Sequence, residues 1–515
     1  MIKETNIRVA PKDLNNFEQI KKCAASQLNV AVEEVNDVKI VKKSIDARSK
    51  NVVFQLRVCV GIHEMLKEDL PNSPRKRDVS KSRSVIIVGA GPAGLFAALE
   101  LIEQGCKPIV LERGKNVRER RRDLAAINKE QIVNPESNYC FGEGGAGTYS
   151  DGKLYTRSNK RGNVEKVINI LIEHGADPGI KIDAHPHIGT NKLPKIIVSI
   201  REFIIECGGE VHFNQKVEDL IIDDNKIKGV TTAQNEFIAE DVILATGHSA
   251  RDIFRLLYRK NILIESKPFA LGVRIEHPQS LIDTIQYKCS TKHENLPPAS
   301  YSLVTQTKNK PAYSFCMCPG GIIAPCATAP EEVVTNGWSP SKRNNKFANS
   351  GMVVAVNEQD FEPFEKQGAL AALAFQSSVE HKAWEWGGKS QCAPAQRMID
   401  FVNKRTSSSL PPTSYQPGVV STNLNNVLPN AVHTALREAF QIFGRKMKGY
   451  YTNEAVLHAT ESRTSSPVKI PRDHSSLEHI QIKGLYPCGE GAGYAGGIMS
   501  AAIDGQKCAQ MIAQK

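Results

Sequence analysis

The sequence predicts an α/β protein with a discontinuous Rossmann-like domain, an inserted α+β domain and a small N-terminal α+β domain. Its 515 residues exceed what one small core holds, and roughly 150 residues per domain suggests about three domains. A β-α-β pattern with a glycine-rich turn begins abruptly at Val85, and a second glycine-rich strand stands near Gly489. The domain between these two segments is therefore expected to be an insertion.

The composition is that of an ordinary globular protein, with 41% hydrophobic and 23% charged residues. The net charge of +11 favours acidic ligands or nucleic acid, but a basic surface on a protein that binds phosphorylated cofactors explains it equally well. We find no signal peptide and no run of about 20 apolar residues. The 12 cysteines include no CxxC pair, and His185 and His187 have no cysteine or carboxylate cluster nearby. We therefore expect a cytoplasmic protein with reduced thiols, no metal and no membrane contact.

Residues 1–75 read as the small N-terminal α+β domain. A strand is expected at Ile7–Val9, a helix at Asn15–Leu28, and two alternating strands on either side of a polar turn at Asp46–Asn51. Residues 76–84 are polar and basic, and are predicted to be a linker. Such a basic run is more often solvated than bound to nucleic acid, so nucleic-acid binding is not expected.

A complete β-α-β unit follows the linker. The run 85–88 has the pattern of a buried strand, residues 95–104 that of a helix, and residues 108–111 that of a second strand ending in Glu112. This is the spacing of a dinucleotide-binding unit, whose acidic residue accepts hydrogen bonds from a ribose. The helix N-terminus offers unpaired N–H groups to phosphates. The turn between strand and helix consists of Gly89, Ala90, Gly91, Pro92, Ala93 and Gly94.

At each of three positions in this turn there is a physical reason for glycine. Gly89 allows the tight turn, Gly91 lets the backbone approach a pyrophosphate, and Gly94 permits close packing of helix on strand. A glycine pattern alone is weak evidence, but here strand, helix, second strand and acid are all in place.

Later segments indicate which dinucleotide is bound. Short strands are expected between 209 and 239, running into Asp241–Gly247, and residues 484–493 precede a C-terminal helix. These features resemble the FAD-dependent oxidoreductases of the glutathione reductase superfamily. The runs FGEGGAGTYSDGKL, LATGHSARD, SFCMCPGG and ESRTSSPVKI are similar to a bacterial family of uncharacterised FAD-dependent dehydrogenases. The resemblance covers most of residues 84–515.

The resemblance implies FAD as cofactor. It implies that Glu112 binds the adenosine ribose, Val217 meets the adenine through its backbone, and Gly247 lies beside the ribityl–pyrophosphate. Glu490 stands where the superfamily usually has Asp, which hydrogen-bonds the ribityl chain; Glu490 keeps the carboxylate and adds one methylene. The helix after Gly497 would aim its N-terminus at the flavin. The residues expected to bind FAD are Gly89, Ala90, Gly91, Pro92, Ala93, Gly94, Glu112, Arg113, Gly144, Gly145, Ala146, Gly147, Thr148, Val217, Ala245, Thr246, Gly247, Gly489, Glu490, Gly497 and Ile498.

The predicted FAD-binding domain consists of residues 85–265 and 445–515, and the predicted substrate domain of residues 266–444. Gly491, Gly493 and Gly496 repeat the glycine spacing, but no further strand and acid follow them. NAD(P)H is therefore expected, if used, only as a diffusible donor without a dedicated domain.

Flavin chemistry needs no side-chain triad, because the cofactor carries the electrons. His248 follows a strand end, where α/β proteins place ligands. A purely structural role in the loop explains this histidine equally well. Arg397 and Arg463 are candidates to clamp an anionic substrate or a phosphate, with exposed salt bridges as the alternative. Cys316 and Cys318 lie two apart in a strand-like run and should face the same way. Packed, reduced thiols are favoured over a redox pair there, because no positive group stands nearby in sequence.

The sequence thus predicts an FAD-dependent oxidoreductase, most simply a dehydrogenase, that acts on a small molecule, with anionic compounds among the candidates. A flavin monooxygenase and an FAD-dependent RNA-modifying protein are the alternatives. The oligomeric state is left open.

Overall fold

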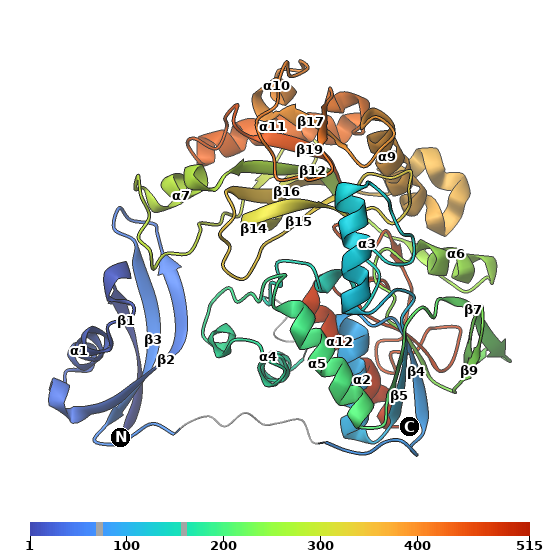
Figure 1. The fold of residues 1–515 in the computed structure, drawn as a ribbon, viewed down its shortest axis with the longest axis horizontal. Helices are drawn as coiled ribbons and strands as arrows, with labels where there is room; N and C mark the ends of the chain where they lie inside the picture. The colour runs from blue at the N-terminus through green and yellow to red at the C-terminus, as the bar shows by residue number, and fades with distance from the viewer. Residues whose placement is uncertain (68–75, 156–161) are drawn as a thin grey trace.

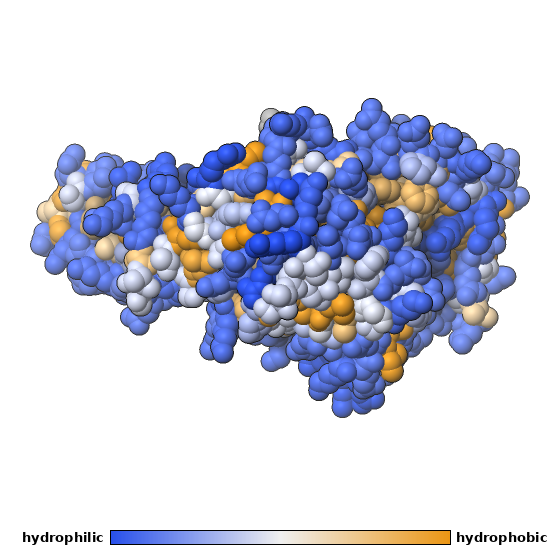
Figure 2. Space-filling model, turned by 90° about the horizontal axis from the view of Figure 1, so that it is seen from above, coloured by the Kyte–Doolittle hydropathy of each residue, from blue (hydrophilic) through white to orange (hydrophobic). Residues whose placement is uncertain are grey.

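The computed structural model describes residues 1–67, 76–155 and 162–515, and its fold is mixed α/β, as predicted (Figure 1). Residues 68–75 of the predicted N-terminal domain lie outside the described residues. Among the described residues, no helix has the length and apolar character needed to cross a lipid bilayer. The face seen in Figure 2 is mostly hydrophilic, and its hydrophobic residues form separate small groups, as is normal on a protein surface.

The N-terminal unit is a three-stranded antiparallel sheet with one helix. Strand order is β1-β3-β2, and apolar residues of α1 such as Ile20 and Ala24 pack on the sheet. Asn16 caps the helix by accepting a hydrogen bond from the Gln19 N–H, and Asn29 ends it in the left-handed conformation. The elements are β1 (Ile2–Val9), α1 (Phe17–Leu28), β2 (Val35–Asp46) and β3 (Val53–Ile62).

A five-stranded parallel sheet forms the centre of the second unit, in the order β21-β10-β4-β5-β6. Residues of β4 alternate between two hydrophobic cores, so the sheet is buried on both faces, as parallel sheets are. Helices α2, α5 and α12 contribute to the core on one face. The strands are β4 (Ser84–Val88), β5 (Lys107–Leu111), β6 (Glu210–His212), β10 (Val242–Leu244) and β21 (Leu485–Pro487). The helices are α2 (Pro92–Gln104), α3 (Val117–Lys129), α4 (Val164–Glu173), α5 (Leu193–Glu206), α6 (Arg251–Arg259) and α12 (Ile498–Ala513).

The short strands expected between 209 and 247 divide between two sheets. The first and last, β6 and β10, join the parallel sheet, whereas β7 (Val217–Asp223), β8 (Lys226–Thr232) and β9 (Glu236–Ile238) form a separate antiparallel sheet. The predicted turn between β7 and β8 is present, with Asp224 and Asn225 at positive φ. Apolar residues of β7 and β8 complete the core on the second face of the parallel sheet.

The third unit is an eight-stranded mixed sheet, with the path β13-β14-β16-β12-β19-β17-β18 and β15 paired to β14. Helices α9 and α11 cover it on the side away from the parallel sheet (Figure 1). The strands are β12 (Phe269–Pro278), β13 (Val304–Gln306), β14 (Pro311–Pro325), β15 (Thr335–Trp338), β16 (Phe347–Val356), β17 (Ala393–Arg397), β18 (Val419–Ser421) and β19 (Val456–Glu461). The helices are α7 (Gln279–Tyr287), α8 (Glu358–Phe361), α9 (Ala371–Trp386), α10 (Met398–Val402) and α11 (Asn430–Lys446), and a small β11 (Glu265–Ser266) pairs with β20 (Val468–Lys469).

Two boundaries differ from those read in the sequence. Strand β19 pairs with β12 and β17, so the third unit continues to residue 461 instead of ending at 444. Residues 76–84 are not a free linker, because Val79 is fully buried and its N–H donates to the Cys207 carbonyl. Both differences arise from pairing between residues far apart in the chain, which local patterns do not report.

Candidate FAD-binding site

A cleft of about 910 Å³ lies between the parallel sheet and the third unit. It opens at the carboxyl ends of β4, β10 and β21 and at the N-termini of α2 and α12, the edge where open α/β sheets bind ligands. Its volume is near the upper end of the roughly 300–1,000 Å³ usual for ligand and cofactor pockets. The predicted FAD-binding residues that line it are Gly89, Gly91, Pro92, Ala93, Glu112, Arg113, Gly145, Ala146, Gly147, Val217, Ala245, Thr246, Gly247, Glu490, Gly497 and Ile498.

The glycine turn has the shape that its sequence predicts. Gly89 has a φ of +106°, and a Cβ there would lie 2.5 Å from the Ala245 carbonyl oxygen. A Cβ at Gly94 would lie 1.9 Å from the Gly89 carbonyl oxygen, so only glycine lets the helix pack this closely. A Cβ at Gly91, in contrast, would meet no atom closer than 3.9 Å. Gly91 therefore faces open space in the cleft, while Gly89 and Gly94 hold the turn together.

Glu112 holds the backbone at one end of the cleft. The buried carboxylate accepts hydrogen bonds from the Ala90 N–H through Oε2 and from the Gly114 and Gly142 N–H groups through Oε1, each at 2.9 Å. A carboxylate has about four acceptor sites, so one remains for a ligand hydroxyl. Besides the ribose contact that the resemblance implies, Glu112 thus joins the glycine turn to the loop at 142.

The glycine-rich segment 141–147 packs directly against the turn. The Gly144 N–H donates to the Ala90 carbonyl at 2.8 Å, and the Thr148 hydroxyl donates to the Glu143 carbonyl at 2.7 Å. These contacts place Gly144 and Thr148 behind the surface of the cleft. Ala90, Gly94 and Gly489 are likewise not among the residues that line the cleft.

The lining suits an extended ligand that carries both anionic and polar groups. The Thr246 hydroxyl is buried without a hydrogen-bond partner, and burial raises the pKa of the Glu490 carboxylate to about 7. A Cβ at Gly247 or Gly497 would meet nothing within 4 Å. Helix α2 presents its N-terminus, a site for phosphate, at one side, and α12 presents its own at the other. The residues present therefore fit FAD. The N-terminus of α2 would hold the pyrophosphate, and the polar groups along the cleft would contact the rest of the cofactor.

Four residues were predicted as candidates for chemistry. The structure places His248, Cys316 and Arg463 on the lining of the cleft, but not Arg397. His248 lines the cleft, its Nδ1 lies 2.8 Å from the Ser249 hydroxyl, and burial lowers the pKa of His248 to about 4, so the ring is neutral at pH 7. Arg397 is not among the cleft residues and donates to the carbonyls of Ser409 and Asn453. The structure therefore does not bring Arg397 to the site.

Arg463 lines the cleft, but its guanidinium is fully engaged. Nε donates to Glu380, Nη1 donates to the Ser249 and Thr328 hydroxyls, and Nη2 donates to Glu332 and Glu380. Since an arginine has five N–H donors, none is left for an anionic substrate. The expectation that Arg397 and Arg463 clamp an anion is therefore not supported by their surroundings.

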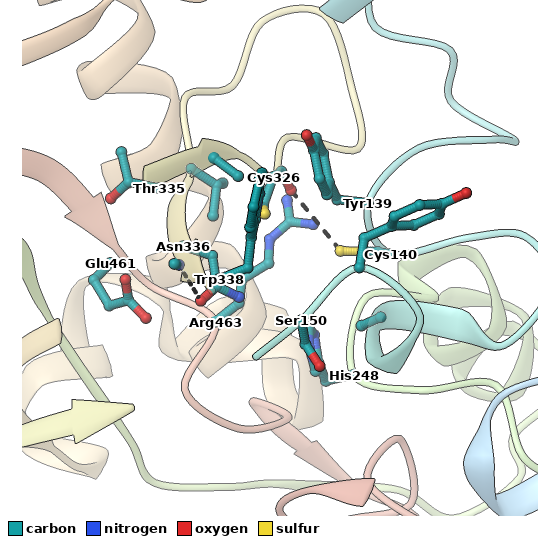
Figure 3. Close-up of a pocket in the computed structure, with 15 residues that line it drawn as sticks. Tyr139, Cys140, Ser150, His248, Cys326, Thr335, Asn336, Trp338, Glu461 and Arg463 are labelled. Carbon is teal, nitrogen blue, oxygen red and sulfur yellow. Dashed lines mark hydrogen bonds between the residues drawn. The ribbon is translucent and has the colours of Figure 1, made fainter. Parts of the chain in front are cut away.

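A small chamber adjoins the cleft and shares His248, Asn336 and Arg463 with it (Figure 3). Glu461, at the end of β19, lines this chamber and receives hydrogen bonds of 3.2 Å from Arg274 to both oxygens. Burial raises the pKa of Glu461 to about 7, against the opposing effect of Arg274. The Thr335 hydroxyl is buried there without a partner. Glu461 was missed in the sequence, although a carboxylate that ends a buried strand was a usable signal.

The cysteines of β14 are arranged differently from the packed strand pair that the sequence predicts. The ladder with β16 shifts register between Phe315 and Cys318, and Cys316 has a φ of +47°. As a result Cys316 is exposed to the cleft, whereas Cys318 is fully buried. The Lys153 Nζ lies 3.8 Å from the Cys316 Sγ and 4.0 Å from the Cys318 Sγ. The positive group that the neighbouring sequence lacks therefore comes from a distant segment.

One cluster of potential metal ligands occurs among the described residues, formed by Cys488, Asp504 and Cys508. Arg472 donates to both Asp504 oxygens, at 2.6 and 3.0 Å, and lies 3.6 Å from the Cys508 Sγ. The guanidinium already supplies the positive charge at this cluster, and we assign no metal to it.

Three family models match the chain. Residues 82–130 match an FAD binding domain, residues 268–464 match the C-terminal-domain-like model of FAD-dependent proteins, and residues 1–61 match a domain of unknown function. The first match covers the glycine turn and Glu112, and the second ends close to the boundary after β19. They confirm the prediction that FAD is the cofactor.

Comparisons by sequence and by structure each find similar proteins. An uncharacterised protein of Clostridium beijerinckii is 40% identical over 533 residues, which covers 100% of this chain and 99% of that protein. The thiamine thiazole synthase of Methanococcus vannielii is 28% identical over 197 residues, 34% of this chain and 60% of its own. Among solved structures, CtdE in complex with FAD and a substrate aligns with a TM-score of 0.35 at 10% identity, covering 84% of this chain and 80% of CtdE. Glycine oxidase from Bacillus cereus aligns with a TM-score of 0.30 at 13% identity, covering 84% and 96%.

The match to the clostridial protein extends over the whole length of both chains, through all three units and the cleft between them. Membership of the glutathione reductase superfamily in particular remains a prediction. The chain belongs to the same family as this clostridial protein, a family of FAD-dependent oxidoreductases.

Proposed function

We propose that the protein is an FAD-dependent dehydrogenase that oxidises a small polar substrate at the junction of the cleft and the small chamber. The observation that carries the proposal is the position of Glu461 and His248, two proton acceptors on the chamber beside the cleft. FAD, when bound, accepts the hydride or electron pair that the substrate gives up. The protein then has to orient the substrate and take up its proton.

Glu461 is suited to handle that proton. A group with a pKa near the working pH is the most effective general base, because its reactive form is populated and the proton transfer is still favourable. The pKa of Glu461, raised by burial to about 7, meets this condition, and Arg274 holds the carboxylate in place. His248 is neutral at this pH and can hydrogen bond to the substrate. Both groups are oriented by further contacts before any substrate arrives.

The topology supports the substrate itself as the source of electrons. In the described part of the chain, only one sheet has the parallel dinucleotide-binding arrangement. NAD(P)H would thus have to enter as a diffusible donor through the same opening. A flavin monooxygenase, which would need such a donor, is the second candidate. The RNA-modifying alternative rests on the net charge of +11 and on the basic run before residue 84.

The test is anaerobic reduction of the purified holoprotein, followed by its flavin absorbance. NADH, NADPH and a panel of small amino and hydroxy compounds are added separately. We expect a compound of the panel to bleach the flavin without oxygen, at a rate that increases with pH through about 7 as Glu461 loses its proton.

The Glu461→Gln variant should bind FAD normally but be reduced about 10²–10⁴-fold more slowly, without the pH dependence, because the base is absent. Glu358→Gln, at an exposed position, is the matched control. Bleaching by NADPH alone, with oxygen uptake and a hydroxylated product, would instead identify a monooxygenase.

A further inference from the structure

We propose that Cys316 and Cys318 form a redox-active dithiol on the wall of the FAD cleft, with Cys316 as the reacting thiolate. Oxidation of the pair to an intrachain disulfide delivers its electron pair to FAD. This inference rests on FAD binding and is independent of the dehydrogenase proposal.

The two thiols have the unequal exposure that such a pair requires. Cys316 is exposed and lines the same cleft as Gly91, Glu490 and Ile498, whereas Cys318 lies behind it and is fully buried. A partner from solution or from the cleft can therefore reach Cys316 but not Cys318. The buried thiol is then left to react only with its neighbour.

The backbone at the two cysteines departs from a regular strand, and both sulfurs lie near one cation. In a regular strand, residues two apart are separated by about 6.6 Å, at the upper limit for a disulfide. Here the register shift and the left-handed Cys316 interrupt the strand. The Cys318 thiol points back toward residue 316, with its Sγ 3.3 Å from the Cys316 carbonyl oxygen. Both sulfurs lie within 4.0 Å of the same Lys153 Nζ.

Positive charge surrounds the pair. Besides Lys153, the Arg274 Nη2 lies 3.4 Å from the Cys318 Sγ and donates to the Cys316 carbonyl at 2.7 Å. The pKa of the Cys316 thiol is well below its ordinary value, because the Cys318 thiol donates a hydrogen bond to it and because Lys153 and Arg274 are close. A low pKa of this origin is what makes a cysteine nucleophilic.

The carboxylates that face Cys316 are Asp151, Glu461 and Glu490, and they oppose the two cations. Two of the three are already paired with arginines, Asp151 with Arg343 at 2.6 Å and Glu461 with Arg274 itself. Glu490 has a pKa raised by burial to about 7, so near neutrality it carries only part of its negative charge.

The proposed step is balanced in atoms and electrons. The Cys316 thiolate and the Cys318 thiol form one S–S bond, the Cys318 S–H bond breaks, and two electrons and that proton pass to FAD. A pair of low-molecular-weight thiols would restore the dithiol by exchange, and would be oxidised to their own disulfide. The pair would thus link FAD to thiol compounds that are too large, or wrongly shaped, to reach the flavin.

The first test is an anaerobic reductive titration of the holoprotein after it has been oxidised in air. We expect wild type to consume two electron pairs per FAD, and Cys316→Ser and Cys318→Ser to consume one. Peptide mass analysis of oxidised wild type should show a peptide with both cysteines that is lighter by two hydrogens. One electron pair per FAD in wild type, with no such peptide, would overturn the proposal.

The second test needs no cysteine variant, in case those proteins do not fold. The rate of iodoacetamide alkylation at Cys316 in the holoprotein is measured against pH by peptide mass. We expect its midpoint to lie well below the roughly 8.5 of an ordinary thiol. Lys153→Gln should move the midpoint upward, while Lys195→Gln, at an exposed position on α5, should not. An ordinary midpoint in wild type, unchanged in Lys153→Gln, would show that Cys316 is not the reacting thiolate.

Discussion

Glu112 is expected to stabilise the FAD-binding domain even without FAD. The Glu112→Gln variant tests this, because an amide offers only one acceptor oxygen to the three N–H groups that the carboxylate now serves. If that oxygen faces Gly114 and Gly142, the amide NH₂ meets the Ala90 N–H, and two donors oppose one another. A hydrogen bond to a charged group contributes about 1.5–3 kcal/mol, and the two retained bonds lose their charge assistance.

Together these losses amount to about 3 kcal/mol of unfolding free energy. For a domain of this size that corresponds to a decrease of about 6–12 °C in the melting temperature. The assay is a thermal scan of FAD-free protein, repeated with FAD added, with Glu202→Gln at an exposed position of α5 as control. FAD-free Glu112→Gln that melts like wild type, but binds FAD weakly, would show that the carboxylate serves the ribose alone.

Three further outcomes are expected. The Gly91→Val variant should fold, because Gly91 has the ordinary extended φ of −78°. It should purify without flavin absorbance, since the valine side chain enters the cleft. Full FAD occupancy of this variant would contradict our placement of the pyrophosphate. Deletion of residues 1–75 should leave FAD bound, because the residues that line the cleft begin at Val88. A flavin-free or insoluble product would show that the N-terminal unit is integral to the fold. Glu380→Gln should lower the unfolding free energy by about 3–5 kcal/mol, because two buried arginines, Arg251 and Arg463, lose their shared carboxylate. Although burial opposes it, these arginines lower the pKa of Glu380 to about 2, so the stabilisation is complete above pH 4.5 and is lost as the pH falls toward 2. The melting difference between wild type and variant should therefore shrink in acid, and a constant difference would contradict this reading.

The features that the sequence predicted well are local ones. The strand, turn and helix from 84 to 104 follow from a short apolar run, three glycines and a proline, each with its own steric reason. The same holds for the N-terminal unit, where α1 and the strands β2 and β3 lie within a few residues of their expected positions. In these segments the neighbouring residues alone decide the conformation.

The features that the sequence did not reveal depend on residues that meet only in the fold. Cys316 had no cation nearby in the chain, and Lys153 comes from a segment more than 160 residues away. Arg463 was a candidate for an anion clamp or for an exposed salt bridge, and the partners that bury it, Glu332 and Glu380, stand 131 and 83 residues earlier. Patterns within one segment carry no information on such pairs.

The far walls of the cleft are made by segments that are far apart in the chain, so the ribosome releases them at different times. The glycine turn at 89–94 emerges early, but β21 and the first turn of α12 complete the sheet edge and the cleft only after about residue 500. Until then strand β10 has an unpaired edge, and the helix α2 lacks the partner whose Gly505 packs against Ala93. A nascent chain can therefore hold FAD firmly only after about residue 500 has been synthesised. A chain that terminates before residue 485 would expose an unpaired strand edge, a known route to aggregation.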